Sequence, residues 1–201
     1  AYPWGEADSP LAKYPGPDNW QVEVMDYIGK ALQTSDKAVR VAISSGHGSG
    51  KSALFSFLIS WFMATRPDAN IKATANTKTQ LQATLWRELA LWHKRSLFID
   101  WFDWMATSYR AKESPETWVA NAIPWSVNNA EAFAGMHGKH VAVFFDEASA
   151  IDDVIWETIE GAFTTGEYKP LFVVAGNPTR SSGGFYRCFH DRNSPWKTFR
   201  V

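Results

Sequence analysis

The chain has 201 residues, 45% of them hydrophobic and 20% charged, which suits one globular domain with its own core and excludes a disordered chain. The formal net charge of −1 excludes a uniformly basic nucleic-acid-binding domain, so any contact with DNA has to be local. The single cysteine, Cys188, excludes an internal disulfide and favours a reducing compartment.

The first half of the chain is expected to alternate helices and strands. It begins with an extended lead-in rich in proline and glycine, residues 1–17, after which Asp18 is a suitable N-cap. In chain order we expect a helix over 20–32, a strand over 38–44, a buried apolar helix over 51–66, a strand over 70–76 and an amphipathic helix over 77–96.

The second half begins with an aromatic-rich stretch that prolines interrupt, in which we expect one edge strand within residues 118–127. We then expect a strand over 140–149 that ends in two acids, a helix over 152–163, a strand over 169–179 and a closing strand over 196–201. Apolar strands that alternate with helices predict an α/β fold with a mostly parallel sheet covered on both faces.

The loop after the first expected strand is a candidate phosphate-binding site. Its sequence, SSGHGSGKS over residues 44–52, departs from G-x-x-x-x-G-K-[ST] only at Ser45. The remaining glycines permit backbone conformations that point successive N–H groups at phosphate oxygens, with a helix N-terminus behind them. The alternative is a glycine-rich turn without a ligand. We assign these residues to nucleotide binding: Ser45, Gly46, His47, Gly48, Ser49, Gly50, Lys51 and Ser52.

Two residues of this loop carry specific roles. Lys51 is expected to reach the β- and γ-phosphates, and the Ser52 hydroxyl to hold Mg²⁺.

Two acids at the end of the strand over 140–149 complete this pattern. Asp146 is expected to bind Mg²⁺, and Glu147 to polarise the attacking water. The alternative for the acids is a strand end with two solvated carboxylates.

Two amides are further candidates. Asn177 follows the strand over 169–179 and would sense the γ-phosphate if that strand lies beside the other two; the alternative is a simple Gly-Asn-Pro turn. Gln21 would read the adenine edge through its donor and acceptor, with Trp20 or Tyr27 packed on the base. The alternative for Gln21 is an exposed helix residue.

Five segments together resemble the ATPase domain of the large terminase subunit, the DNA-packaging motor of tailed phages and prophages. They are WQVEVM, SSGHGSGKSA, ATANTKTQL, EAFAGMHGKHVAVFFDEASAID and VVAGNPTRSSGGFYRCF. The resemblance covers residues 18–201. It implies one P-loop NTPase domain of the additional-strand class, related to RecA-like and helicase motors, that couples Mg-ATP hydrolysis to translocation of double-stranded DNA into a procapsid. In that family the asparagine couples hydrolysis to movement.

The resemblance also implies partners and a location. The partners are double-stranded DNA, the portal protein and the small terminase subunit. A homo-oligomeric ring is expected when the motor is assembled, and a monomer for the isolated domain. The location is the host bacterial cytoplasm, at the portal. The longest apolar run, residues 53–64, is shorter than the roughly 20 residues that span a membrane, so no membrane association is expected.

The family also carries a C-terminal nuclease domain, which we do not expect in this chain. Because the chain begins at Ala1 without a methionine and stops at Val201 directly after an expected strand, we expect an excised domain. Two other functions stay open. One is a fragment of another RecA-like or helicase-like DNA-dependent ATPase, and the other is an assembly module that binds nucleotide without turnover.

One departure from the family concerns His47, which stands where many relatives carry an arginine, and no role is assigned to it. An arginine finger from a neighbouring subunit is also expected. Its candidates are Arg87, Arg95, Arg110 and Arg180, with Arg180 first because it follows Asn177 closely. For weak, salt-sensitive DNA contact we expect a small basic patch drawn from Lys72, Lys78, Lys94, Arg95, Arg110, Lys112 and Lys139.

Overall fold

A computed structural model describes residues 2–201 except 76, 126–135, 137 and 164–168. The described residues form an eight-stranded sheet with the order β3-β4-β5-β2-β6-β7-β1-β8. The strands are β1 Val39–Ser44, β2 Ala69–Thr74, β3 Phe102–Trp104, β4 Ser108–Ala111, β5 Val119–Ala122, β6 His140–Phe145, β7 Leu171–Gly176 and β8 Lys197–Arg200. From β5 to β8 all neighbours are parallel, while β3 and β4 add an antiparallel hairpin.

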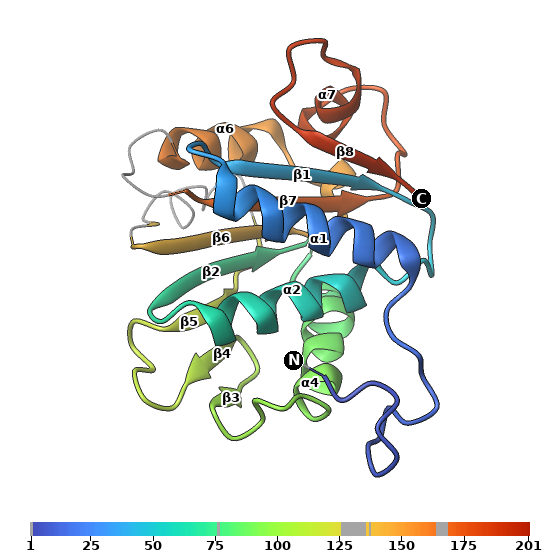
Figure 1. Ribbon diagram of the computed structural model, residues 1–201. Helices are drawn as coiled ribbons and strands as arrows, with labels where there is room; N and C mark the ends of the chain where they lie inside the picture. Colours follow the sequence, from blue (N-terminus) through green and yellow to red (C-terminus); the bar gives the residue numbers. More distant parts are fainter. Residues whose placement is uncertain (1, 76, 126–135, 137, 164–168) are drawn as a thin grey trace.

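Helices cover both faces of the sheet (Figure 1). They are α1 Asn19–Thr34, α2 Lys51–Thr65, α3 Lys78–Leu81, α4 Arg87–His93, α6 Asp153–Phe163 and α7 Gly184–His190. Successive side chains of a strand point to opposite faces, as the two aromatic residues at the end of β6 illustrate. Phe144 packs on Phe55 of α2, and Phe145 packs on Trp156 of α6. The predicted α/β architecture, with a mostly parallel sheet between two helical layers, is confirmed.

The individual elements match the expected ones closely in the strand–loop–helix region. Asp18 caps α1, β1 runs into the glycine-rich loop, and α2 begins at Lys51. The strand expected within residues 118–127 exists as β5, but its placement at an edge was wrong. It lies between β4 and β2, because the unpredicted hairpin of β3 and β4 adds to its outer side.

The amphipathic helix expected over 77–96 is helical but not uniform. Thr77 caps α3, a π-helical turn covers Gln82–Trp86, and α4 continues from Arg87. A π-turn inserts one residue into the helical register and therefore rotates the residues that follow. In the part of the chain that the structure describes, no helix is long and apolar enough to cross a bilayer.

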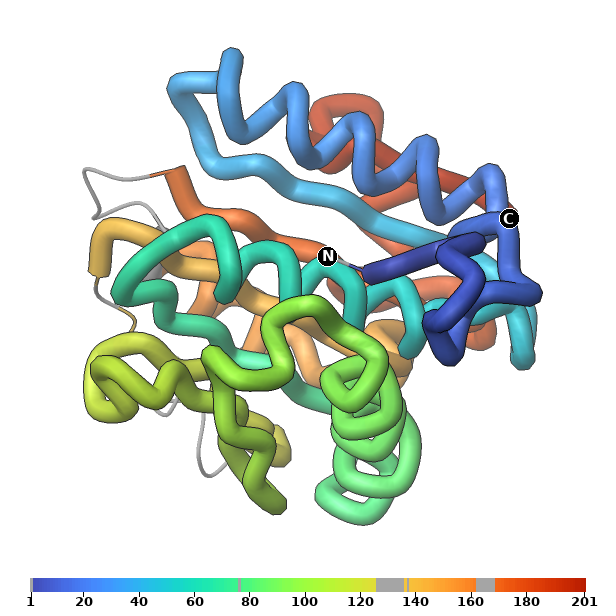
Figure 2. Tube along the Cα trace, turned by 60° about the horizontal axis from the view of Figure 1, so that its bottom comes forward, coloured from blue at the N-terminus to red at the C-terminus, as the bar shows by residue number. Residues whose placement is uncertain are grey.

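The segment before α1 packs against the domain through turns. The Leu11 side chain is fully buried. The Trp4 ring contacts Phe57 of α2 and Trp92 of α4, with centroids 6.0 and 5.3 Å apart. In Figure 2 this segment, in dark blue, lies across the start of α2. Aromatic pairs of this kind contribute about 0.5–1.5 kcal/mol each beyond the area that they bury.

The contact between α6 and α7 leads to a stability prediction. A Cβ at Gly184 would lie 2.4 Å from Trp156 Cδ2, and the rings of Phe145 and Phe172 pack against that indole. Gly184→Ala is therefore expected to lower the free energy of unfolding by about 1–3 kcal/mol. Urea unfolding measures this change in the free energy of unfolding. Gly29→Ala is the control, because a Cβ at Gly29 in α1 meets nothing within 4 Å. Equal stability of the two variants would contradict the prediction.

Candidate functional site

The predicted site residues follow the ends of parallel strands at one edge of the sheet. The glycine-rich loop follows β1, Asp146 follows β6 and Asn177 follows β7. Because β7 lies between β1 and β6, the condition stated for Asn177 is met, and its strand is adjacent to the other two. In Figure 1 the arrowheads of β1 and β7 point toward the same edge. The topology therefore assembles the motifs in one place.

The loop between β1 and α2 accepts serine at its first position. Gly48 and Gly50 have φ angles of +72° and +88°, in the left-handed region that favours glycine. Ser45 is outside that region, so its side chain causes no backbone strain. The Ser45 N–H donates to the Gly176 carbonyl at 3.1 Å, and its hydroxyl shares a hydrogen bond with Ser49 at 2.8 Å. The backbone N–H of residue 45 thus ties the loop to the end of β7, and the serine hydroxyl adds a hydrogen bond within the loop.

The Lys51 ammonium lies inside the loop. Its Nζ donates to the Gly46 carbonyl at 2.6 Å and to the Ser45 carbonyl at 3.4 Å, and the side chain is 7% exposed. These carbonyls are neutral acceptors, whereas phosphate oxygens are charged and make stronger hydrogen bonds with an ammonium. A phosphate ligand would therefore compete well for Lys51. Gly46, His47 and Gly48 form the exposed rim of the loop.

Ser52 and Asp146 lie together although 94 residues separate them. The Ser52 hydroxyl donates to Asp146 Oδ2 at 3.4 Å. Burial and, second, the neighbouring Glu147 raise the pKa of Asp146 to about 6. The Lys51 ammonium offsets only part of this rise, and a divalent ion would supply further positive charge. The described residues contain no group of three or more His, Cys, Asp or Glu side chains arranged for a metal.

Glu147 has an unusual backbone. Its φ of +51° is left-handed, which is uncommon for a residue with a Cβ and costs on the order of 1 kcal/mol. Its N–H donates to Asp146 Oδ1 at 3.0 Å, and its carbonyl accepts from Ala150 at 3.0 Å. The side chain is half-buried. This geometry turns the chain sharply after Asp146, so the two successive acids leave the strand in different directions.

The ends of β6 and β7 are in direct backbone contact. A Cβ at Gly176 would lie 3.1 and 3.2 Å from the backbone nitrogens of Ala148 and Ser149, so this position suits glycine. The half-buried Asn177 follows, and the Ser149 and Thr179 hydroxyls share a hydrogen bond at 3.2 Å. Sequence reasoning missed this link between the two strand ends, because neither hydroxyl belongs to a spacing that marks a partner.

Gln21 contacts the loop, but both ends of its amide are already engaged. Nε2 donates to the Gly50 carbonyl at 3.0 Å, and Oε1 accepts from the Asp18 N–H at 3.0 Å. The side chain is 4% exposed, which rules out the exposed-helix alternative. Gln21 thus joins the start of α1 to the start of α2 in addition to any role with a base. Of its proposed aromatic partners, Tyr27 packs instead on Phe199 of β8.

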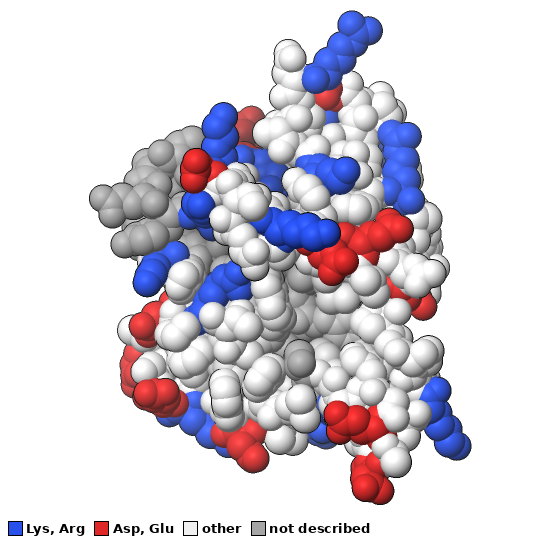
Figure 3. Space-filling view, in the orientation of Figure 1, with Lys and Arg blue, Asp and Glu red and all other residues white. Residues whose placement is uncertain are grey.

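The Lys and Arg side chains that the structure describes do not gather into one positively charged surface. On the face in Figure 3, Lys and Arg side chains are interspersed with Asp and Glu. Lys72 was wrongly included among the DNA-contact candidates, since it lies on β2 and is 8% exposed. Lys112 pairs with Asp103 at 3.8 Å. Lys78, Lys94 and Lys139 are exposed.

The four candidates for an arginine finger differ in their surroundings. Arg87 and Arg180 are exposed. The Arg95 guanidinium lies 5.0 Å from the Trp92 ring centroid, and Arg110 Nε donates to the Ser108 hydroxyl at 2.9 Å. Arg180 combines exposure with a position close to the end of β7.

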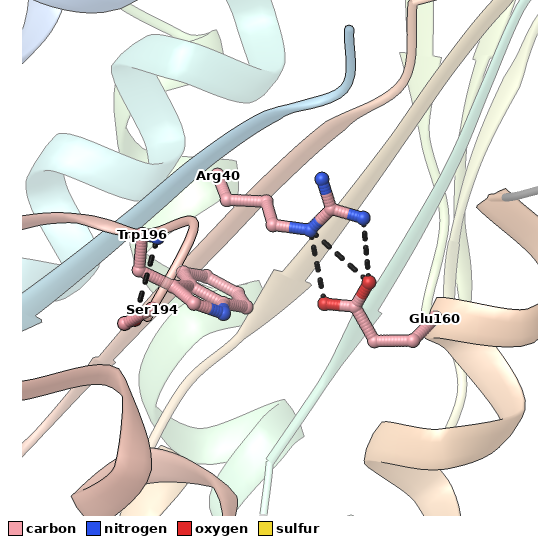
Figure 4. Close-up of polar contacts among 4 residues, drawn as sticks. All are labelled: Arg40, Glu160, Ser194 and Trp196. Carbon is pink, nitrogen blue, oxygen red and sulfur yellow. Dashed lines mark hydrogen bonds and ion pairs between the residues drawn. The ribbon is translucent and has the colours of Figure 1, made fainter. Parts of the chain in front are cut away.

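Arg40 of β1 has a structural role. Its guanidinium binds the Glu160 carboxylate of α6 with two parallel hydrogen bonds, Nε to Oε1 at 3.0 Å and Nη2 to Oε2 at 2.6 Å. Figure 4 shows this pair beside Trp196, whose backbone N–H donates to the Ser194 hydroxyl oxygen at 3.4 Å. Because the arginine side chain is 15% exposed, this ion pair is better shielded from water than a surface pair and fixes β1 against α6.

Comparison with known proteins identifies relatives in sequence. No family model matches the chain. The probable large terminase subunit of Enterobacteria phage P7 is 29% identical over 157 residues, which cover 74% of this chain and 31% of that protein. The chain thus spans about a third of the length of this curated relative.

Solved structures of phage terminases share the fold. The large terminase of the thermophilic bacteriophage D6E superimposes with a TM-score of 0.67 at 17% identity, over 92% of this chain and 46% of that one. The ATPase domain of the Thermus phage P74-26 large terminase gives 0.60 at 16% identity, over 92% and 80%. The D6E protein has also been solved with ATP-γ-S, with a TM-score of 0.59, 18% identity and coverage of 91% and 44%. The resemblance of this chain to the phage large terminase subunit is confirmed in sequence, and the chain shares the fold of the solved terminase ATPase domain.

Proposed function

We propose that this chain is the ATPase domain of a phage terminase large subunit, and that it binds Mg-ATP in the loop over 44–52 and hydrolyses it. The observation that carries the proposal is the contact of Ser52 with Asp146 at 3.4 Å, directly beside Lys51. A hydroxyl and a carboxylate from two distant motifs meet where one cation would bridge them. The phage P7 relative and the D6E structure with ATP-γ-S support this reading.

The donor set fits Mg²⁺. Ser52 and Asp146 offer hard oxygen ligands, and Mg²⁺ in NTPases is typically held by one or two such groups together with phosphates and water. The raised pKa of the buried Asp146 carboxyl agrees with a site that a cation completes. When bound, Mg²⁺ neutralises charge on the β- and γ-phosphate oxygens.

The chain's own residues supply the remaining chemistry. The Lys51 ammonium binds β- and γ-phosphate oxygens in place of the Gly46 carbonyl. The Glu147 carboxylate accepts a proton from water as the water oxygen bonds to the γ-phosphorus. The bond from that phosphorus to the bridging oxygen breaks, and its electron pair leaves with ADP. The half-buried position of Glu147 beside Asp146 suits this role.

Coupling to movement is proposed to run through Asn177. The end of β7 contacts the turn after β6 through Gly176, and the Ser149–Thr179 hydrogen bond joins the same segments. A change at the γ-phosphate would therefore move the chain after Asn177, including the exposed Arg180. Arg180 is our first candidate for a finger that reaches a neighbouring subunit.

The biological setting is proposed from the family. The motor would move double-stranded DNA into a procapsid in the host cytoplasm, as a ring docked on the portal and supplied by the small terminase subunit. The interspersed surface charges suggest local, salt-sensitive contact with DNA. Stimulation of phosphate release by double-stranded DNA would support this setting.

Lys51→Ala tests the nucleotide site. We expect Mg-dependent ATP binding and phosphate release for the unaltered protein, and a loss of kcat/KM of about 10²–10³ for the variant, because a preorganised cation is removed from the developing charge. Lys37→Ala is the control, since Lys37 is exposed and precedes β1 at its opposite end. Absence of Mg-dependent nucleotide binding by the unaltered protein would refute the proposal. Binding without turnover in the presence of DNA would favour an assembly module.

A further inference from the structure

We infer that the surface formed by α7 and the end of β8 contacts the phosphate backbone of double-stranded DNA, mainly through Arg192 and Arg200. The inference deepens the proposed function and rests on it, because it takes a DNA duplex to be the substrate of the motor. It places the local, salt-sensitive contact with DNA in a part of the chain that the candidates drawn from the sequence did not include.

The stretch that follows Asn177 differs in charge from the rest of the chain. Residues 178–201 contain five of the 20 Lys and Arg residues but one of the 21 Asp and Glu residues. The remaining residues therefore hold fewer cations than carboxylates. In Figure 3 the charged side chains over α7 and β8 are mostly Lys and Arg. A local excess of positive charge of this kind attracts a polyanion.

Two arginines beside α7 are available to a ligand. Arg192 follows the end of α7, and Arg200, at the end of β8, has its guanidinium 5.7 Å from the ring centroid of Phe189 in α7. Both arginines are exposed. Within the residues that the structure describes, neither forms an ion pair with a carboxylate. Their N–H donors can therefore bind phosphate oxygens without first breaking an ion pair.

Two other cations of the same stretch contribute less. Arg187 of α7 pairs with Asp153 of α6 at 2.8 Å, so its charge is already compensated. The Lys197 ammonium lies 5.6 Å from the ring centroid of Tyr27 in α1, on the other face of the sheet. The contact with DNA is therefore assigned to the two arginines on the α7 side.

Carboxylates limit the surface on the side of α6. Glu157 and the exposed Asp191 line the hollow between α6 and the connection from α7 to β8. Glu160 lines it as well but is paired with Arg40. Because unpaired carboxylates repel phosphates, a duplex would lie toward the end of β8 rather than over α6. Asp191 thus opposes the contact that its neighbouring arginine makes.

The surface is joined to the nucleotide site through α7. A Cβ at Gly176, the residue before Asn177, would lie 3.5 Å from Phe185 Cε1 of α7. Asp153 accepts from the Gly184 N–H at 2.7 Å and so holds the start of α7 on α6. A displacement of the chain after Asn177 would reach the arginines through α7 alone. A duplex held there would move with the segment that senses the γ-phosphate.

The end of β8 gives a second connection. Arg200 is in register with Ser44, the last residue of β1, and the Val201 N–H donates to the Ser44 carbonyl at 2.9 Å. Ser44 leads directly into the phosphate-binding loop. The backbone that carries Arg200 is therefore hydrogen-bonded to the start of that loop.

Binding of a short labelled DNA duplex, followed by fluorescence anisotropy over a series of salt concentrations, tests the assignment. We expect Arg192→Ala and Arg200→Ala each to weaken binding about three- to tenfold at low salt, and to reduce the slope of log affinity against log salt by about one, because each removes one phosphate contact. Asp191→Asn should have the opposite effect and tighten binding about threefold, because it removes a repulsive charge.

Lys13→Ala is the control for the loss of one positive charge. Lys13 is exposed and lies in the segment before α1, away from α7 (Figure 1), so duplex affinity should stay unchanged. Equal duplex affinity of Arg192→Ala, Arg200→Ala and the unaltered protein would overturn the assignment, and so would a failure of the unaltered protein to bind the duplex at low salt.

Phosphate release from Mg-ATP separates this assignment from the proposed function. For each protein the ratio of the rates with and without the duplex is measured. This stimulation should fall in Arg192→Ala and Arg200→Ala and persist in Lys13→Ala. If the unaltered protein hydrolyses Mg-ATP but the two arginine variants keep its full stimulation, the surface is wrongly assigned and the proposed function stands. If the unaltered protein releases no phosphate with or without the duplex, the proposed function itself fails.

Discussion

Glu147→Gln is expected to slow ATP hydrolysis about 10²–10⁴-fold in a single turnover, and to leave Mg-ADP affinity unchanged. A general base contributes about this factor, and an amide cannot accept the proton of the attacking water. Glutamine has nearly the same shape as glutamate. Residue 147 should therefore keep its left-handed backbone conformation, and the free-energy cost of that conformation should stay the same. Rapid-quench measurement of ADP formation, with protein in excess over ATP, isolates the chemical step.

Glu157→Gln is the matched control for this variant. Glu157 lies on α6, is exposed, and undergoes the same chemical change away from the loop. Its hydrolysis rate should equal that of the unaltered protein. Normal single-turnover hydrolysis by Glu147→Gln would exclude the base role of Glu147, whereas Lys51 and Asp146 would keep theirs, because neither depends on proton acceptance at residue 147.

The motifs and their strands could be predicted because local signals and tertiary demands agree there. β1 is apolar and β-branched, the loop after it carries glycines at the positions with positive φ, and α2 is apolar on every side because it is buried. A parallel sheet then places the loop, Asp146 and Asn177 at one edge without further information. The order of the strands, which places β7 between β1 and β6, came only from the structure.

Other features depend on contacts that a single sequence does not reveal. The hairpin of β3 and β4 is short, and its pairing with β5 is decided by the burial of Phe102 and Tyr109, so the strand expected at the edge became internal. Gln21 accepts from the Asp18 N–H in a capping box whose three-residue spacing can be read from the sequence, but only the three-dimensional approach of α1 to the loop shows that Gln21 also donates to Gly50. Side-chain partners across such distances leave no periodic pattern.

The contact of Lys51 with the loop carbonyls shows why nucleotide binding and loop conformation are linked. The Lys51 ammonium donates to the carbonyls of Gly46 and Ser45. A phosphate oxygen that binds the ammonium would compete with those carbonyls for it. The Ser45 N–H also donates to the Gly176 carbonyl, so the loop that holds Lys51 is hydrogen-bonded to the end of β7, next to Asn177.

Asp146→Asn is expected to stabilise the protein in the absence of ligand at pH 7.5 and to weaken Mg-dependent nucleotide binding. Burial raises the pKa of this carboxyl from 3.8 to about 6. In the unfolded chain it loses its proton near pH 3.8, whereas in the folded protein it keeps the proton up to about pH 6. Ionised Asp146 therefore destabilises the fold, by on the order of 3 kcal/mol above pH 6, and this cost disappears as the pH falls toward 3.8.

Urea unfolding in EDTA measures the effect on stability. The free energy of unfolding of Asp146→Asn should exceed that of the unaltered protein at pH 7.5, and the difference should shrink at pH 4.5. Asp8→Asn, at an exposed position, is the control and should show no such difference. A gain in stability that is the same at both pH values would contradict the raised pKa, because it would reflect packing rather than charge.

The same carboxylate should control nucleotide affinity in the opposite direction. Mg²⁺ requires the ionised form, so protons compete with it below pH 6, and Mg-ADP affinity should fall by up to about tenfold per pH unit in that range. The diphosphate itself titrates nearby, so the informative quantity is the ratio of the affinities of the unaltered protein and Asp146→Asn at each pH. That ratio should be largest above pH 7 and about tenfold smaller near pH 5. A ratio independent of pH would mean that Asp146 does not hold the ion. The Asp146 carboxylate, which lowers the free energy of unfolding when no ion is bound, would then not be compensated by Mg²⁺ binding. Its burial beside Ser52 would need another explanation.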